Sequence, residues 1–553
     1  MAIPASDGRP AMLKNHCVYL GLLCTLVACS SADQGSSSAG TGGVGAAGIG
    51  GTPGAAATFG AGGMNGVPPS TGGKLAGAGG GLSTGSTSAI GGAGALGGSG
   101  AVGGTGAAGG GGVTATTGGA PGTGTGGNGA ATGGASAGGA GGTPPPVCTA
   151  AASEPADFMP NTTAGGGGTV VKDSPRFRIY GSAPAATADT TLNHLEAAYS
   201  CFIDDWCFRS TGLVVQKDGG PYYKTNIYAT GSLGSAAGLT QLDFTAGLPY
   251  VQVISSQMAM PRVTVHEWGH AFTISEYNWV DQKRTGAWWE TVANWVADTY
   301  MTSAYCAPAR SKYGVAEGST LIDLSKVIGQ SYMLIVSTQN YYEAWPFLTY
   351  LTMNPDHYAG LGKLAVQDLM RKHTRMNETP LHVLDTMVSP VKAQAVIGRY
   401  WAHMAYLDIG HPKAQAAFFS SRATLNFANL DSMGNQTYKV KAARQPQYGG
   451  SNIIPLTGTG AVSVQVKNLG NGLPESNFTA TLSIRASDGT VRYVDLPGGM
   501  GQATIASGEE ASLVVANTPD MLYQYDAFAT TAASPESIGL NYQVQITGAA
   551  PAN

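Results

Sequence analysis

The sequence RVTVHEWGHAF, residues 262–272, is the segment from which the central part of the fold can be predicted. His266 and His270 are four residues apart, so on a helix both imidazoles leave the same face, one turn from each other. Glu267 is the only charged residue between positions 263 and 272. A charge inside a buried helix needs a compensating partner, because burying an unpaired charge is costly. The spacing therefore predicts a buried helix with two metal-ligating histidines and a carboxylate beside them.

A catalytic zinc site usually has three protein ligands and one open position, so a third ligand is expected downstream. Glu276 lies six residues after His270, the spacing of metzincin-type proteins, but those proteins need a glycine where Thr273 stands here. Glu290 lies twenty residues after His270, within WWETVANW at residues 288–295. The apolar spacing of that segment predicts a second buried helix. We therefore expect Glu290, and not Glu276, to be the third ligand of Zn²⁺.

The motif HEWGH at residues 266–270, followed by Glu290 after nineteen intervening residues, resembles the gluzincin zinc metallopeptidases, which have thermolysin-like ligand spacing. More loosely, the two predicted helices are similar to a family of secreted bacterial proteins that includes virulence and avirulence proteins. The resemblance implies a zincin-like fold and hydrolysis of peptide bonds by a metal-activated water, with Glu267 as general base. In gluzincins an aspartate four residues after the glutamate ligand orients a histidine ligand. Here Asn294 stands at that position and Asp298 follows one turn later, so we expect both to support the ligands.

Peptide hydrolysis also needs a hydrogen-bond donor for the negative charge that develops on the carbonyl oxygen. In enzymes of this type the donor is typically a His or a Tyr from the downstream part of the domain. We expect it among Tyr341, Tyr342 and His373, and further candidates are His357, His382 and His403.

Two other classes of function remain open. One is a non-catalytic, zinc-stabilised surface adhesin or a carbohydrate- or protein-binding lipoprotein, because an inactive relative would keep most of the ligand residues. The other is a structural lipoprotein in which HEWGH is accidental. Zinc content separates the last alternative from the others, and replacement of Glu267 separates an enzyme from a binding protein.

The N-terminus has the layout of a bacterial secretory signal. Its apolar run, residues 18–28, is too short to span a bilayer. The sequence LVAC at residues 26–29 resembles the lipobox of bacterial lipoproteins, which implies a signal peptide over residues 1–29 and lipidation of Cys29. Acyl chains would anchor such a protein to a membrane. Because Ser30 follows the cysteine, the resemblance implies an exported cell-surface or outer-membrane lipoprotein. The alternative is a plain signal peptide with an incidental cysteine.

Residues 30–165 are expected to be a disordered linker. The chain contains 83 glycines and only 11% charged residues, and most of the glycine precedes Pro146. Gly, Ala, Ser and Thr offer too little apolar area to offset backbone entropy. A coil of ~115 residues would have an end-to-end distance of about 60 Å, which suits a stalk. The net charge of −4 provides no basic field, so nucleic acid is not an expected partner.

Four cysteines follow Cys29, namely Cys148, Cys201, Cys207 and Cys306. In an exported protein an even number favours two disulfides, for which three connectivities exist. Cys201 and Cys207 are near enough to pair locally; alternatively, Cys306 ties its helix to the first half of the domain.

We expect an α+β fold, with a zincin-like peptidase domain at residues 166–437 and a small all-β sandwich at residues 438–553. Expected strands lie at residues 177–180, 223–228 and 250–254, and expected helices at 189–202, 331–339, 342–353, 360–373, 381–387 and 391–407. A strand beside the metal-binding helix would bind a protein or peptide substrate by backbone pairing, as in gluzincins. The sandwich, predicted from alternating apolar residues, would cover the catalytic domain or bind a glycan or protein ligand.

Overall fold

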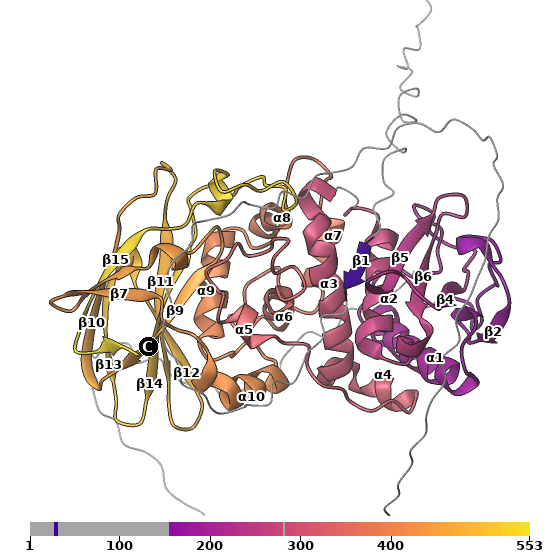
Figure 1. Ribbon diagram of the computed structural model, residues 1–553, viewed down its shortest axis with the longest axis horizontal. Helices are drawn as coiled ribbons and strands as arrows, with labels where there is room; N and C mark the ends of the chain where they lie inside the picture. Colours follow the sequence, from indigo (N-terminus) through magenta and orange to yellow (C-terminus); the bar gives the residue numbers. More distant parts are fainter. Residues whose placement is uncertain (1–26, 31–153, 280–281, 553) are drawn as a thin grey trace, which may run out of the picture. The chain divides into compact units, whose positions relative to one another are not determined.

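The computed structural model describes residues 27–30, 154–279 and 282–552 of the chain (Figure 1). The part of the expected signal peptide before Val27, most of the expected glycine-rich linker, and Cys148 lie outside the described residues. The described part is an α+β structure, as the sequence predicts, and it contains three β-sheets. In the described ranges, no helix is both long and apolar enough to cross a membrane.

The first sheet has six strands in the order β1-β5-β6-β4-β3-β2. Their bounds are β1 (Val27–Ser30), β2 (Val170–Asp173), β3 (Phe177–Gly181), β4 (Thr225–Thr230), β5 (Ala236–Asp243) and β6 (Leu248–Ile254). The three central strands β3, β4 and β6 are parallel, whereas β5 runs antiparallel to β6, and β1 runs antiparallel to β5. Ile179, Ile227 and Val251 are neighbours across β3, β4 and β6 and are fully buried, as expected for a sheet with one face in the core. Helices α1 (Ala185–Tyr199) and α2 (Pro261–Glu276) pack on the sheet (Figure 1).

The two helices that the sequence predicts around HEWGH and Glu290 are present and pack against each other. The first is α2, which begins with Pro261 in its first turn, where a missing N–H costs nothing. The second is α3 (Gln282–Thr302). A Cβ added at Gly269 would lie 3.0 Å from the Cα of Ala293 on α3. The glycine of HEWGH therefore allows the close approach of the two helices.

A region of short helices follows α3. It contains α4 (Ala307–Lys312), α5 (Leu324–Val327), α6 (Trp345–Met353), α7 (Ala365–Arg371), α8 (Pro380–Met387), α9 (Ala393–Met404) and α10 (Pro412–Ser421). The helix predicted at residues 331–339 is wrong, because this segment forms turns. Its backbone bonds to a distant loop instead: Ile335 N donates to Tyr448 O, and Ser451 N donates to Ser331 O. Helices α4, α5 and α10 were not predicted.

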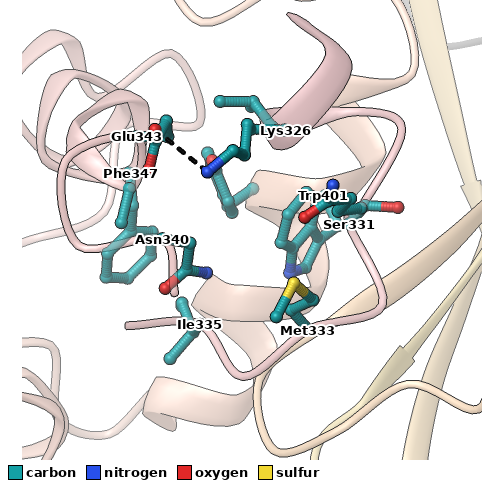
Figure 2. Close-up of a pocket in the computed structure, with 12 residues that line it drawn as sticks. Lys326, Ser331, Met333, Ile335, Asn340, Glu343, Phe347 and Trp401 are labelled. Carbon is teal, nitrogen blue, oxygen red and sulfur yellow. Dashed lines mark ion pairs between the residues drawn. The ribbon is translucent and has the colours of Figure 1, made fainter. Parts of the chain in front are cut away.

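A small cavity lies among α5, α6 and α9, and Figure 2 shows the side chains around it. Its volume is about 20 Å³, which is room for about one water molecule. Lys326 Nζ lies 3.5 Å from Glu343 Oε1 at its wall. This cavity is too small for an organic ligand.

The C-terminal part is a sandwich of two five-stranded antiparallel sheets, ordered β13-β10-β15-β8-β7 and β12-β11-β14-β9-β16. The strands are β7 (Leu430–Gly434), β8 (Thr437–Val440), β9 (Ser451–Thr457), β10 (Gly460–Asn468), β11 (Phe478–Arg485), β12 (Val491–Asp495), β13 (Met500–Ile505), β14 (Glu510–Asn517), β15 (Tyr542–Thr547) and β16 (Ala550–Pro551). One apolar cluster joins residues of both sheets, including Val464, Leu482 and Val544. The two sheets therefore share a core of their own.

Two expected domain boundaries lie too late in the sequence. Strand β7 already belongs to the sandwich, because it pairs with β8 in the same sheet. Asn435 and Gln436 take positive φ values (50° and 59°) in the hairpin turn between the two strands. Likewise, the folded part begins before residue 166: Phe158 is only 1% exposed, and Met159 bridges to Tyr223. A single buried apolar residue such as Phe158 is hard to recognise next to a glycine-rich sequence.

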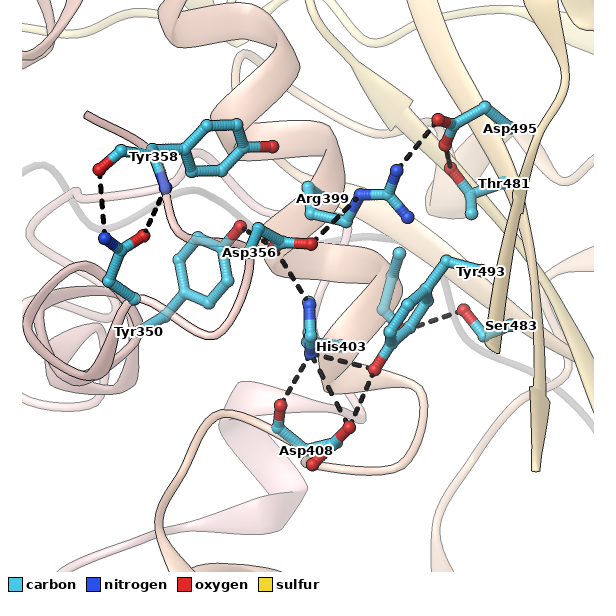
Figure 3. Close-up of polar contacts among 12 residues, drawn as sticks. Tyr350, Asp356, Tyr358, Arg399, His403, Asp408, Thr481, Ser483, Tyr493 and Asp495 are labelled. Carbon is cyan, nitrogen blue, oxygen red and sulfur yellow. Dashed lines mark hydrogen bonds and ion pairs between the residues drawn. The ribbon is translucent and has the colours of Figure 1, made fainter. Parts of the chain in front are cut away.

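A polar network joins the helical region to the sandwich, and Figure 3 shows it. His403 on α9 lies at its centre, with Nε2 2.9 Å from Asp356 Oδ2 and Nδ1 2.8 Å from the Tyr493 hydroxyl of β12. Arg399, also on α9, lies 2.8 Å from Asp495 of the same strand. Both ring nitrogens of His403 are thus engaged, so this predicted candidate for the carbonyl-oxygen donor has a structural role.

A disulfide joins Cys201 to Cys306, which lie 105 residues apart. The local pairing of Cys201 with Cys207 is therefore wrong, and Cys207 is itself disulfide-bonded. Cys306, directly after α3, is tied to the turn after α1.

Candidate metal centre

His266, His270 and Glu290 form one buried group between α2 and α3. Their ligand atoms all lie within 4.8 Å of one another, and their exposed fractions are 3%, 2% and 6%. Glu290 Oε2 is 3.3 Å from His266 Nε2 and 3.5 Å from His270 Nε2. The ligands that the spacing predicts therefore do converge, and the group can hold a metal ion.

The separations suit a tetrahedral ion. Ligand atoms at ~2.0–2.1 Å from Zn²⁺ and at tetrahedral angles lie roughly 3.4 Å apart, close to the two distances above. Neither ring nitrogen of His270 makes a hydrogen bond within the described part of the chain, although both are buried. A buried polar atom without such a bond is costly. A cation between the three side chains would remove that cost.

Electrostatics in the group favours positive charge. Burial raises the pKa of Glu290, but the charge of His270 and the hydrogen bond from His266 outweigh burial and lower the pKa to about 2. Burial lowers the pKa of His266, but the hydrogen bond and charge of Glu290 raise it, so that it ends above its usual value. The site thus holds an ionised carboxylate that attracts a proton or a cation between the side chains.

Asn294 orients one of the two imidazoles. Its Oδ1 lies 2.7 Å from His266 Nδ1, and its Nδ2 donates to Tyr342 O at 2.6 Å. Because Oδ1 can only accept, Nδ1 of His266 donates, so Nε2 is the ring nitrogen that would bind a metal ion. Asn294 thus makes the contact that an aspartate makes in gluzincins.

Glu267 lies against β5, a strand that was not predicted. The Thr240 hydroxyl donates to Glu267 O at 2.6 Å and lies 3.1 Å from its Oε2. A Cβ added at Gly238 would lie 2.4–2.7 Å from atoms of the Glu267 side chain. Gly238 therefore leaves room for the carboxylate, and Thr240 orients it. A glycine inside a strand often marks a place that another group approaches closely, and Gly238 was the sequence signal for this contact.

Asp298 does not support the ligands, which corrects the prediction. Its Oδ2 lies 2.6 Å from His411 Nε2, and its Oδ1 accepts from the Thr320 hydroxyl and from Leu321 N. At eight residues from Glu290 on α3, it lies two turns further along the helix. Its carboxylate joins α3 to the segment before α5 and to α10.

Glu276, the rejected alternative for the third ligand, is engaged elsewhere. Arg371 donates to both of its carboxylate oxygens at 2.8 Å, and Arg209 N donates to Oε1 at 2.9 Å. A carboxylate with this bidentate partner is a structural acceptor.

Of the three candidates for the carbonyl-oxygen donor, Tyr342 lies beside the ligands. Its ring centroid is 6.2 Å from that of His266, and 4.6 Å from that of Tyr341. Tyr341 O also accepts from the Thr291 hydroxyl of α3. His373, in contrast, contacts its own loop through Glu378 O and Arg375 N, so this candidate does not fit.

Cys29, the expected lipidation site, lies in β1, whose backbone pairs with β5. Val27 is opposite Thr240, and Ala28 is opposite Leu239. The edge of β5 beside Glu267 thus carries an antiparallel segment of the same chain.

The fold and the site together describe an α+β protein with a buried group of two histidines and one glutamate that can hold a metal ion. A family model described as "Family of unknown function (DUF6055)" matches residues 180–553. This match covers more than half of the chain, so the protein belongs to that family. No curated protein and no solved structure matches the chain.

Proposed function

We propose that the protein is a secreted, surface-anchored zinc metallopeptidase with a zincin-like catalytic domain, most simply an endopeptidase. The observation that carries this proposal is the buried group of His266, His270 and Glu290 with Glu267 next to it on α2. Two imidazoles and one carboxylate are a donor set typical of catalytic zinc. When bound, zinc supplies a water of lowered pKa and polarises the substrate carbonyl.

Glu267 is the proton carrier of the proposed reaction. It is fully buried, and its position is fixed by Thr240 and by the absence of a side chain at Gly238. A carboxylate held in this way takes a proton from the attacking water and delivers it to the leaving amine. Tyr342 is the best placed of the expected donors for the carbonyl oxygen, because its ring lies beside His266.

The edge of β5 is the proposed binding site for an extended polypeptide. Backbone pairing along a strand edge holds a peptide extended and independent of most of its side chains. The antiparallel pairing of β1 with β5 supports this use of the edge. If lipoprotein processing cleaves before Cys29, Val27 and Ala28 leave that edge and part of β5 becomes available to substrate.

The test of catalysis compares the purified protein with Glu267→Gln. We expect hydrolysis of fluorescently labelled casein that a chelator abolishes and stoichiometric zinc restores. Glu267→Gln should lose roughly 10²–10⁴-fold in turnover and keep its zinc. Full activity in this variant would refute the mechanism. Stoichiometric zinc without turnover in the unaltered protein would favour the adhesin alternative.

The anchor is tested separately. Lipidation of Cys29 would hold the protein at the membrane by acyl chains, with the glycine-rich stretch as a stalk. We expect Cys29→Ala to move the protein from the membrane fraction to the soluble fraction and to abolish labelling by radioactive palmitate. Unchanged labelling in this variant would refute the anchor and leave the catalytic proposal intact.

A further inference from the structure

A second and larger cavity lies at the C-terminal end of α3 and shares no lining residue with the metal-ligand group. Its volume is about 900 Å³, within the ~300–1,000 Å³ of pockets that hold small organic molecules. It lies between the end of α3, the segment that continues into α4, and the start of α10. Most of its large lining side chains are apolar: Trp206, Trp295, Tyr305, Val315, Met353 and Pro412.

Arg310 supplies a buried positive charge to this lining. The residue is only 4% exposed, and its Nη1 donates to Tyr300 O and Ser303 O. These carbonyls belong to the last turn of α3 and to the residue after it, and a helix C-terminus attracts a cation. That contact explains the position of the guanidinium but does not neutralise it. Among the described residues, no carboxylate oxygen lies within 4.0 Å of Arg310 nitrogens. Burial lowers the pKa of Arg310, and the charge of Glu317 only partly opposes this.

The other charged groups of the lining are already paired. Lys413 Nζ lies 3.1 Å from Glu317 Oε2 and donates to Gly318 O at 2.7 Å. His411 is engaged by Asp298 at 2.6 Å. Arg310 is therefore the lining charge without an ion-pair partner in the described part of the chain. A buried charge of this kind is normally compensated.

We propose that this cavity binds a small organic carboxylate with an apolar body. The carboxylate pairs with the Arg310 guanidinium, which matches its planar geometry. The apolar body packs against the aromatic and aliphatic lining around Tyr305 and Met353. A single guanidinium that has no ion-pair partner among the described residues, in a mainly apolar cavity, suits a single negative charge. A phosphate dianion would need more donors.

The test measures binding of phenylacetate by calorimetry, with phenylacetamide as its neutral counterpart of the same shape. The measurement uses the full chain carrying His270→Ala, so that a carboxylate cannot bind a metal held by the first group. We expect one phenylacetate per chain, and binding of phenylacetamide that is at least roughly tenfold weaker because the charge-assisted contact is lost.

A matched pair of variants locates the site without disturbing the core. Ala307 is exposed and lines the cavity, whereas Ala316 is exposed nearby and does not. We expect Ala307→Trp to abolish phenylacetate binding at an unchanged Tm, and Ala316→Trp to retain it. The proposal is overturned if phenylacetate does not bind in the millimolar range, if the amide binds equally well, or if Ala307→Trp has no effect.

Discussion

Two carboxylates on α3, Glu290 and Asp298, are both buried against histidines, but their surroundings differ. Asp298 faces one histidine and accepts further hydrogen bonds from Thr302, Thr320 and Leu321 N. Glu290 faces two imidazoles at 3.3 and 3.5 Å, and one of them, that of His270, makes no hydrogen bond in the described structure. The hydrogen bonds around Asp298 come from protein donors, whereas the group around Glu290 can hold a metal ion. Burial and a nearby histidine therefore do not suffice to identify a metal site. The other hydrogen-bond partners of the carboxylate and of its histidines distinguish a metal site from a structural contact.

The largest expected effect is on metal binding. Glu290→Gln removes the charged ligand, and we expect zinc affinity to fall by more than about 100-fold, since loss of a mere supporting contact already costs 10–100-fold. Asp298→Asn should leave affinity unchanged. Competition with a fluorescent zinc chelator measures both variants. Equal losses in the two would mean that the carboxylates do not differ as described.

The order of the two variants should be reversed for the free energy of unfolding, with the larger loss in Asp298→Asn. With metal removed, we expect Asp298→Asn to lower the free energy of unfolding by about 3 kcal/mol, because breaking one partner of a buried pair leaves the other unpaired. Glu290→Gln should cost less, because Asp298 also accepts hydrogen bonds from Thr302, Thr320 and Leu321 N, which weaken when its charge is removed. Urea unfolding after treatment with a chelator measures this difference, and a larger loss for Glu290→Gln would contradict it.

A smaller effect is expected at Asn294. Asn294→Ala removes the acceptor from His266 Nδ1, and zinc affinity should fall by roughly 10–100-fold. Asn294→Asp keeps an acceptor at the same place and serves as the control. If both variants bind zinc as the unaltered protein does, the contact at 2.7 Å has no role in holding the imidazole.

The smallest effect concerns Asp356, a partly buried carboxylate with a histidine partner (Figure 3). Burial raises the pKa of Asp356, but the hydrogen bond and charge of His403 lower it by more than burial raises it. The folded-state pKa therefore lies below the usual value. The stabilisation is therefore present above the unfolded pKa of about 3.9 and is lost as the pH falls through the lower folded value. We expect the stability difference between the unaltered protein and Asp356→Asn to shrink below about pH 4. Thermal unfolding between pH 3 and pH 7 measures it, and a constant difference would contradict the prediction.

Patterns with a short period were readable from the sequence. The four-residue spacing of His266 and His270, and the apolar spacing around Glu290, predicted two buried helices and the convergence of the three ligands. The α+β class and half of the ten described strands of the sandwich followed from alternation. Asn294 was recognised because it replaces a residue with a known role in the resembling family.

What failed depends on contacts between distant segments. Asp298 was expected beside the ligands, but its partners come from Thr320 and His411, whose approach no local pattern encodes. Residues 331–339 were expected to form a helix, but their backbone makes hydrogen bonds with Tyr448 and Ser451 instead. Strand β5 was missed because Gly238 weakens its strand signal, although that glycine is what makes room for Glu267.

The bond between Cys201 and Cys306 has a consequence for the integrity of the molecule. The covalent ring that it closes contains all of α2 and α3. A single backbone cut anywhere between the two cysteines would leave both fragments attached, and the nicked protein would separate into two pieces only after a reductant is added. An enzyme of the proposed class that cut itself inside this ring would therefore not shed either fragment.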